Sequence, residues 1–226
     1  MPSLTESVAA TARELLVGVT DWCTHPEDLA VARIGGTKNP RVDDILDLRP
    51  DVVLANEEEN RAADLDALRS GDCPVWVTAP RTVPAALRSL DRMLRLACRL
   101  PRPSWLDVAD EVWATSYDGP RRRAVVPIWR RPWMALGGDT FAGDVLERLG
   151  VDNVLAEASE RYPRIALDAL PPHELVVLPD EPYAFSPEDG PDAFADVDVR
   201  CVSGRHLTWY GPSLVEARTR LMAQLA

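Results

Sequence analysis

The spacing of apolar and polar positions changes between helical and strand-like patterns along the whole chain. Residues 3–16 begin with a Ser-to-Glu spacing typical of a helix start, and apolar residues then recur at helical intervals. Short runs rich in β-branched residues at 51–55 and 74–77 follow turn residues and predict buried parallel strands. The segment 60–70 between them mixes apolar and charged residues, as a surface crossover helix does. The first third of the chain therefore predicts a βαβ unit.

The rest of the chain predicts a helical connector and a second α/β half. Residues 82–100 carry apolar side chains at i, i+3, i+4 and i+7 with arginines on the other face, which predicts a long amphipathic helix. Further strands are expected at 124–128, 174–178 and 199–202, and further helices at about 140–149 and 213–225. The predicted organisation is an α/β lobe at 1–80, a connector at 81–117 and a second α/β lobe at 118–226.

The two halves share a pattern. The apolar run at 52–54 in the first half corresponds to the run at 175–178 in the second, and an acidic turn follows each. The helix start at 3–5 likewise corresponds to residues 139–141. Because open parallel sheets bind ligands at the carboxyl ends of their strands, we expect function at the crevice that two such lobes create.

Charge and composition exclude several classes of protein. The net charge of −11 opposes nucleic-acid binding, which requires a basic surface. No run approaches the roughly 18 apolar residues of a membrane span, so we expect no membrane insertion. Residues 1–22 lack the basic start, long apolar stretch and small-residue cleavage site of an export signal, and we therefore expect a cytoplasmic protein.

The side chains that bear chemistry form no recognisable catalytic or metal motif. There is no Gly-x-Ser-x-Gly or His-Glu-x-x-His sequence, and the three histidines are scattered, so no catalytic residue is assigned. Cys23 and His25 are close in sequence, but two ligands do not complete a metal site, and we favour structural roles for both. Residues 137–140 (GGDT) lack the lysine and spacing of a phosphate loop, and indicate a tight turn with a helix cap.

Several motifs together resemble one known family. The motifs are 33–40 (RIGGTKNP), 48–56 (LRPDVVLAN), 58–61 (EENR), 133–140 (WMALGGDT), 162–163 (YP) and 209–212 (WYGP). They are similar to the helical-backbone, class III substrate-binding proteins of ABC importers for cobalamin, heme and iron-siderophores. The resemblance covers nearly the whole chain and implies two small Rossmann-like α/β lobes joined by a long backbone helix. It also implies a non-enzymatic protein that binds a corrinoid, heme or ferric chelate between its lobes.

The chain departs from the family in features that bear on transport. As written it shows no lipid-attachment cysteine, and it starts where family members usually carry an apolar strand before the helix, so we expect either a first lobe that is trimmed of its opening strand or a misassigned start site. For docking to an ABC permease, Asp168 matches the acid of the second lobe, whereas Ala62 stands where the first lobe's acid is expected. A cytoplasmic enzyme, or a regulatory remnant that binds a smaller metabolite, is the alternative.

The expected ligand-binding residues are aromatic and polar side chains at strand ends. Trp22 lies where the first lobe is expected to turn from strand to loop, and an aromatic ring there suits a flat macrocycle. The full set is Trp22, Asn56, Glu57, Tyr162, Tyr183, Trp209 and Tyr210. For each of the aromatic residues, packing in the core or anchoring of a surface loop is the competing interpretation.

Overall fold

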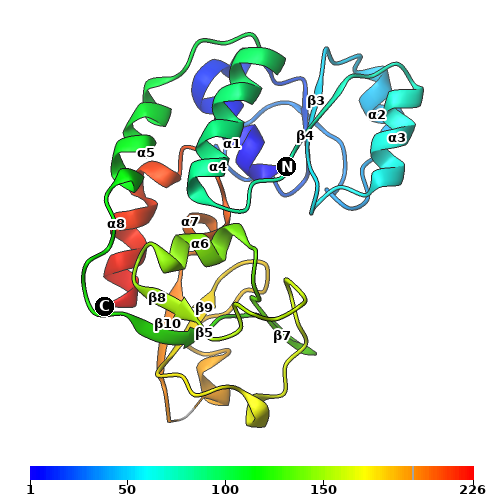
Figure 1. Ribbon diagram of the computed structural model, residues 1–226. Helices are drawn as coiled ribbons and strands as arrows, with labels where there is room; N and C mark the ends of the chain where they lie inside the picture. The colour runs from blue at the N-terminus through cyan, green and yellow to red at the C-terminus, as the bar shows by residue number, and fades with distance from the viewer. Residues whose placement is uncertain (195) are drawn as a thin grey trace. The chain divides into compact units, whose positions relative to one another are not determined.

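The computed structural model describes residues 1–194 and 196–226, which form two compact units (Figure 1). Each unit is built from more than one stretch of the chain. Unit 1 contains Met1–Pro80, Ala85–Val108 and Tyr210–Pro212, and unit 2 contains Arg81–Pro84, Ala109–Trp209 and Ser213–Ala226. The short segment Tyr210–Pro212 thus returns to unit 1 after most of unit 2 has been completed.

Unit 1 contains two small parallel sheets. After α1 (Pro2–Ala12) and the single turn η1 (Arg13–Leu15), strand β1 (Gly18–Val19) pairs with β2 (Ala32–Arg33). Strand β3 (Val53–Asn56) then pairs with β4 (Val75–Thr78).

Two helices, α2 (Val42–Asp47) and α3 (Ala62–Ser70), lie side by side next to β3 and β4 (Figure 1). A small core of Ile45, Leu68 and Cys73 joins them to the start of β4. The βαβ unit expected from the sequence is therefore present.

The connector is helical but interrupted. Helix α4 (Val83–Arg92) continues as the π-helical stretch η2 (Met93–Ala97), and after a break α5 (Ser104–Ala114) begins. The helix expected over 82–100 is therefore shorter than predicted. The reason is local: Arg99 adopts a left-handed conformation with φ of 56°, which an α-helix does not accept, and a proline-containing segment follows.

Unit 2 contains one four-stranded parallel sheet. Its order is β10 (Asp198–Val202), β9 (Leu175–Pro179), β5 (Arg122–Val125) and β8 (Val151–Asn153), so β5 lies between β9 and β8. An antiparallel hairpin of β6 (Pro127–Arg130) and β7 (Trp133–Ala135) follows β5 directly. Besides the second half of α5, this unit contains the helices α6 (Phe141–Glu147), α7 (Gly204–Thr208) and α8 (Leu214–Leu225). The single turns η3 (Leu167–Ala169) and η4 (Pro191–Ala193) lie in its loops.

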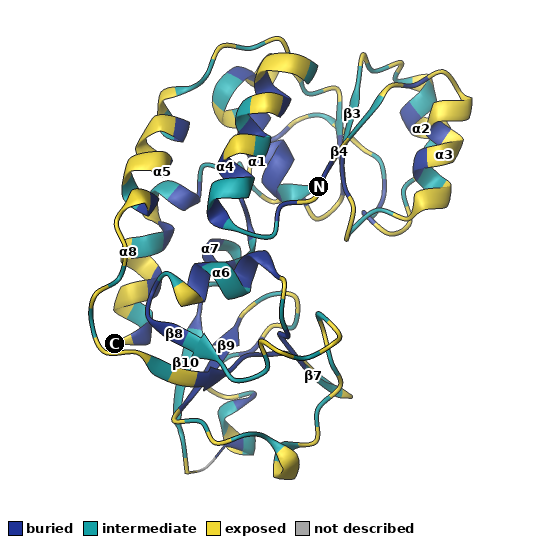
Figure 2. Cartoon of the chain, viewed as in Figure 1, coloured by how far each residue is buried: buried dark blue, intermediate teal, exposed yellow. Residues whose placement is uncertain are grey.

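The core of unit 2 lies around its central strands, as the dark segments of Figure 2 show. All five residues of β9 are buried, so both faces of this strand are covered. A strand that is buried on both faces is apolar throughout, and this is why the sequence pattern identified it. The predicted α/β fold class is confirmed. Among the described residues, no helix combines the length and the apolar character that a bilayer crossing needs.

Candidate ligand-binding residues

Trp22 follows β1 by three residues, and it has the most exposed side chain among the large apolar residues described. Its side chain is 68% exposed. The indole lies close to the backbone at Gly36, where an added methyl group would approach the indole nitrogen to 3.4 Å. A ring that lies against backbone and presents most of its surface to solvent can stack on a flat ligand without rearrangement.

The loop that carries Trp22 is held by the side chains on either side of it. The Arg33 guanidinium donates to the carbonyl oxygens of Thr20 (3.1 Å) and Cys23 (3.0 Å). The Cys23 thiol is buried and lies 3.0 Å from the Thr20 hydroxyl and 3.2 Å from that of Thr5. Cys23 therefore packs in the interior, as the sequence indicated. The hydrogen bonds of Arg33 and the contacts of Cys23 hold the backbone on both sides of Trp22 in place.

Asn56 and Tyr210 form a buried polar network in unit 1. The Asn56 amide nitrogen donates to the Tyr210 phenol oxygen at 2.6 Å. The Thr78 hydroxyl donates to the Ala55 carbonyl oxygen at 3.2 Å, so its oxygen accepts the phenol proton over 3.0 Å. Each donor in this series thus has an acceptor. Burial raises the pKa of Tyr210 to about 12, and the hydrogen bonds to Thr78 and Asn56 partly offset this rise.

Asn56 also shapes the acidic turn that follows β3. Its carbonyl oxygen accepts from the backbone N–H groups of Glu58 (2.8 Å) and Glu59 (3.2 Å). This leaves Glu57 at the tip of the turn with an exposed side chain. The structure therefore gives Asn56 a supporting role in the turn and presents Glu57 to solvent.

Trp209 and Tyr183 are anchored within unit 2. The Trp209 side chain is only 6% exposed, and its indole N–H donates to the Glu181 carboxylate at 2.9 Å. Burial raises the pKa of Glu181, and this hydrogen bond opposes the rise. The Tyr183 hydroxyl donates to Asp189 at 2.6 Å, and the half-buried ring packs edge-on against Trp129 with 5.6 Å between centroids.

Tyr162 is the second exposed aromatic residue of the expected set. It is 37% exposed and lies in a loop that is fixed by backbone hydrogen bonds. The N–H of Ala135 donates to the Pro163 carbonyl (3.0 Å), and the N–H of Gly137 donates to the Arg161 carbonyl (2.7 Å). Tyr162 therefore resembles Trp22 in being an exposed ring on a rigid loop.

The expected residues thus fall into two groups. Trp22, Glu57 and Tyr162 are exposed, Tyr183 is half-buried, and Asn56, Trp209 and Tyr210 are buried. A ligand contact by any of them stays a prediction. Asn56 and Tyr210 are directly bonded, although they are 154 positions apart in sequence.

Sequence reasoning missed an aromatic cluster around the β6–β7 hairpin. Trp133 stacks on Phe185 with 6.0 Å between ring centroids, and Arg130 lies 5.6 Å above the Trp133 ring while it pairs with Asp189 and Asp192. Trp129, at the rim of the cluster, is 41% exposed. The alternation of aromatic and arginine residues along 129–133 was a signal that could have identified this surface.

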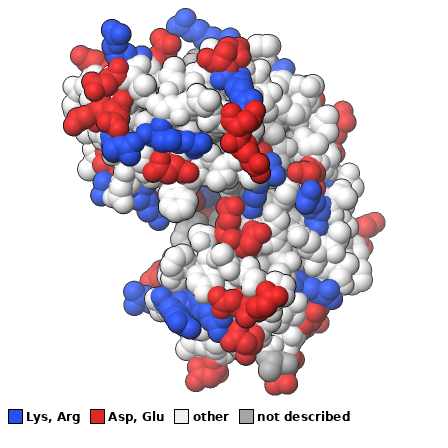
Figure 3. All heavy atoms as spheres, turned by 180° about the vertical axis from the view of Figure 1, so that it is seen from behind, with Lys and Arg blue, Asp and Glu red and all other residues white. Residues whose placement is uncertain are grey.

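Charges of both signs alternate over the face seen in Figure 3, with no basic stripe that would suit a nucleic acid. Most of the arginines lie beside an acid. One example is the pair of Arg122 and Asp198, in which the guanidinium hydrogen bond lowers the pKa of the carboxyl group.

The chain has the fold of a known class of proteins. It has the two α/β units and helical connector of class III substrate-binding proteins, and solved structures of this class match over nearly its whole length. The family resemblance seen in the sequence is therefore confirmed.

Particular relatives can be named for both sequence and structure. Vitamin B12-binding proteins of Pectobacterium carotovorum and Pectobacterium atrosepticum are each 23% identical, with coverage of 99% and 100% of this chain and 86% of each relative. The apo periplasmic heme-binding protein RhuT from Roseiflexus sp. RS-1 matches with a TM-score of 0.83 at 18% identity, covering 99% of this chain and 95% of that one. The periplasmic vitamin B12-binding protein BtuF of Vibrio cholerae matches with a TM-score of 0.76 at 17% identity, covering 100% and 94%. No protein-family model matches the chain.

These relatives correct one expectation. The expected cytoplasmic location is wrong, because the structural neighbours are periplasmic binding proteins. That expectation depended only on the composition of residues 1–22.

Proposed function

We propose that this protein reversibly binds a metal chelate, of the corrinoid, heme or ferric-chelate class, as the substrate-binding component of an ABC importer. Ligand binding as such is supported by relatives that are named for binding vitamin B12 or heme. Those names describe the relatives, and the choice of chelate for this chain is the proposal. Binding in a cleft between the lobes also stays a prediction, which the family resemblance supports.

The observation that carries the proposal is the exposed indole of Trp22. A tryptophan that is 68% exposed on a loop fixed by Arg33 leaves a large apolar surface in water. Covering this surface with a flat ligand favours binding by about 25 cal/mol for each Å² of apolar area that is removed from water. Tyr162 offers a similar, smaller surface in unit 2.

The ligand test is a titration of the purified protein with cyanocobalamin, hemin and a ferric siderophore, followed by visible absorption and calorimetry. We expect saturable binding of one class with a shifted visible spectrum. Absence of binding to all three would contradict the proposal.

The site test compares Trp22→Ala and Tyr162→Ala with Met222→Ala. Met222 is a fitting control because it is 40% exposed on α8, away from the expected site residues in sequence. We expect each aromatic variant to weaken binding by about thirtyfold, equivalent to roughly 2 kcal/mol, without a change in melting temperature. Equal affinities for all three variants would show that the exposed rings do not contact the ligand.

Docking to a permease is the part of the proposal that depends on Asp168. This acid is exposed on the turn η3. In proteoliposomes that contain the host's importer, Asp168→Ala should lower ligand-stimulated ATPase activity and leave ligand affinity unchanged. An unaffected ATPase rate would remove Asp168 from the docking surface.

A further inference from the structure

One carboxylate of unit 2 is contacted by two arginines. Arg161 donates to a single oxygen of Asp139, Oδ2, from Nε at 3.3 Å and from Nη2 at 3.1 Å. The Nε atom of Arg81 lies 3.7 Å from the same oxygen. All three residues belong to unit 2. Two cations thus face one anion, so this group carries a surplus of positive charge in a protein that is acidic as a whole.

The two guanidinium groups also exceed Asp139 in hydrogen-bonding capacity. A guanidinium carries its N–H donors in a planar fork, and two such forks together offer more donors than one carboxylate can accept. The fork matches the geometry of a carboxylate, which arginine binds through two parallel hydrogen bonds. The pair of Arg81 and Arg161 is therefore suited to a second carboxylate in addition to that of Asp139.

Backbone packing holds this group in position. The turn that contains Gly137 and Asp139 lies so close to the loop before Arg161 that a methyl group added at Gly137 would be 2.2 Å from the Glu160 carbonyl oxygen. The Gly137 N–H also donates to the Arg161 carbonyl at 2.7 Å. Because the backbones that carry Asp139 and Arg161 are joined in this way, an anion that binds there has little of the chain to order.

The group is accessible, and an exposed ring lies next to it in sequence. The side chain of Asp139 is 64% exposed and that of Arg161 is 41% exposed, whereas that of Arg81 is only 17% exposed. A guanidinium that is partly removed from water attracts an anion more strongly than a fully solvated one. Tyr162 follows Arg161 directly and offers an aromatic surface. A flat ligand with a carboxylate at its edge fits this combination.

We propose that Arg81 and Arg161 form an anion-binding site, and that the bound chelate is a flat macrocycle with free carboxylates at its edge, as in heme. This inference rests on the proposed function and narrows its ligand class. Asp139 has two effects in this site: it holds the guanidinium groups in place, and its charge competes with that of the ligand. Cyanocobalamin has no free carboxylate and does not meet the requirement.

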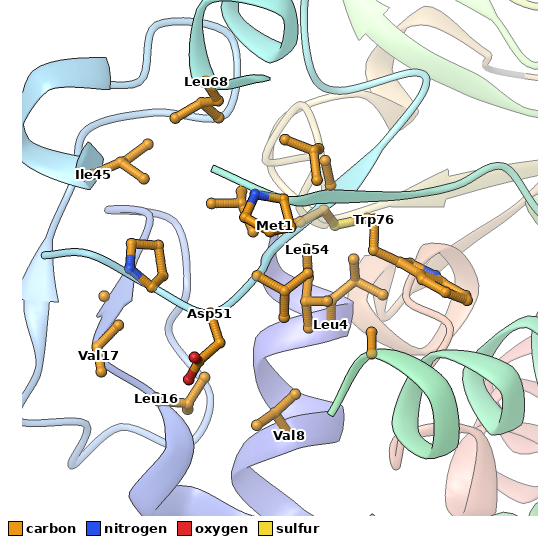
Figure 4. Close-up of a pocket in the computed structure, with 18 of the residues that line it drawn as sticks. Met1, Leu4, Val8, Leu16, Val17, Ile45, Asp51, Leu54, Leu68 and Trp76 are labelled. Carbon is orange, nitrogen blue, oxygen red and sulfur yellow. The ribbon is translucent and has the colours of Figure 1, made fainter. Parts of the chain in front are cut away.

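The other place where an apolar ligand could bind is a cavity within unit 1. It measures about 670 Å³, and most of the side chains that line it are apolar, among them Leu4, Val8 and Leu54 (Figure 4). Substitutions of Arg161 or Asp139 in unit 2 would not change the affinity of a ligand that is held there through apolar contacts.

The test changes each partner of the ion pair separately, and the two changes should act in opposite directions. Arg161→Gln removes the cation and should weaken hemin binding by about fivefold, as expected for a partly exposed charge pair. Asp139→Asn removes the competing charge at nearly constant shape and should strengthen hemin binding by about threefold. Damage to the fold would weaken binding in both variants, so a gain in Asp139→Asn distinguishes anion binding from a structural role.

The matched controls are Arg121→Gln and Asp152→Asn. Arg121 and Asp152 form an ion pair in the same unit, and the Arg121 side chain is 41% exposed, as that of Arg161 is. Both controls should bind hemin like the original protein. Visible absorption measures each affinity, with hemin and with hemin dimethyl ester, in which both carboxylates are blocked. The ester should bind the original protein about fivefold more weakly than hemin, and neither Arg161→Gln nor Asp139→Asn should change its affinity.

Several results would overturn the inference while the proposed function stands. They are equal affinities for hemin and its ester, weaker hemin binding in both Arg161→Gln and Asp139→Asn, and unchanged hemin binding in both. Binding of cyanocobalamin or a ferric siderophore without binding of hemin would have the same meaning. Failure of every chelate to bind would overturn the inference and the proposed function together.

Discussion

Removing the hydroxyl of Tyr210 tests whether the buried network stabilises unit 1. In Tyr210→Phe the ring stays in place, but the Asn56 amide loses its acceptor at 2.6 Å and the Thr78 oxygen loses its donor at 3.0 Å. Leaving a buried polar group unsatisfied costs about 1–3 kcal/mol. Two such groups predict a loss of about 2–6 kcal/mol in the free energy of unfolding, because little space is created for a replacement water.

The assay is urea unfolding followed by circular dichroism, with thermal melts as a second measurement. For a chain of this length about 2 kcal/mol corresponds to a drop of roughly 4–8 °C in melting temperature. Tyr117→Phe is the matched control, since the exposed Tyr117 hydroxyl donates only to the Pro120 carbonyl at 3.0 Å and should change stability by less than about 0.5 kcal/mol. If Tyr210→Phe lowers the free energy of unfolding by no more than this control does, the hydrogen bonds of Tyr210 do not stabilise unit 1 and the reasoning is refuted.

Because burial raises the pKa of Tyr210 to about 12, this phenol ionises at lower pH in the unfolded state than in the folded state. The free energy of unfolding should therefore fall by about 2–3 kcal/mol between pH 10 and 12. Unfolding measured at a series of pH values should show this fall in the original protein and not in Tyr210→Phe. Burial raises the pKa of Glu181, so its contribution to stability is lost as pH rises through the raised value, and Glu181→Gln should flatten the stability profile above about pH 4.5. Trp209→Phe removes the 2.9 Å hydrogen bond to that carboxylate and should lower the free energy of unfolding by about 1–3 kcal/mol, with an unchanged value counting against the bond. Gly138→Ala places a methyl group 2.1 Å from the Ala156 carbonyl oxygen and should lower the melting temperature, equivalent to about 1–3 kcal/mol. Gly119→Ala should be milder, because the nearest neighbours of its added methyl group all belong to the half-buried Tyr117 side chain.

The sequence predicted those elements whose burial pattern repeats in a regular way. The runs at 51–55 and 174–178 became β3 and β9, because buried parallel strands are apolar throughout. The turn at 137–140 was also interpreted correctly, since the Thr140 hydroxyl caps α6 by accepting from the Gly143 N–H at 3.2 Å. Strands β1 and β8 were missed because they have only two and three residues, too few to show a period.

The site was harder to predict because exposure depends on contacts between distant residues. Asn56 and Tyr210 both end or follow a strand, and on that ground they were expected to face a ligand. The structure joins them to each other by a hydrogen bond in the interior of unit 1, and a ligand contact by either stays a prediction. Trp22 has the same kind of position in sequence, but its neighbour Gly36 offers no side chain to cover it. Local sequence could not distinguish these two outcomes.

The segment Tyr210–Pro212 also determines when unit 1 can be completed during synthesis. The chain changes unit after residues 80, 84, 108, 209 and 212, and only the last return brings the phenol to Asn56 and Thr78. A ribosome that has made the first 209 residues has therefore produced all the described strands of unit 1. It has not yet added Tyr210, whose phenol completes the buried hydrogen bonds with Asn56 and Thr78. Unit 1 therefore cannot reach its final form before the segment Tyr210–Pro212 has been made.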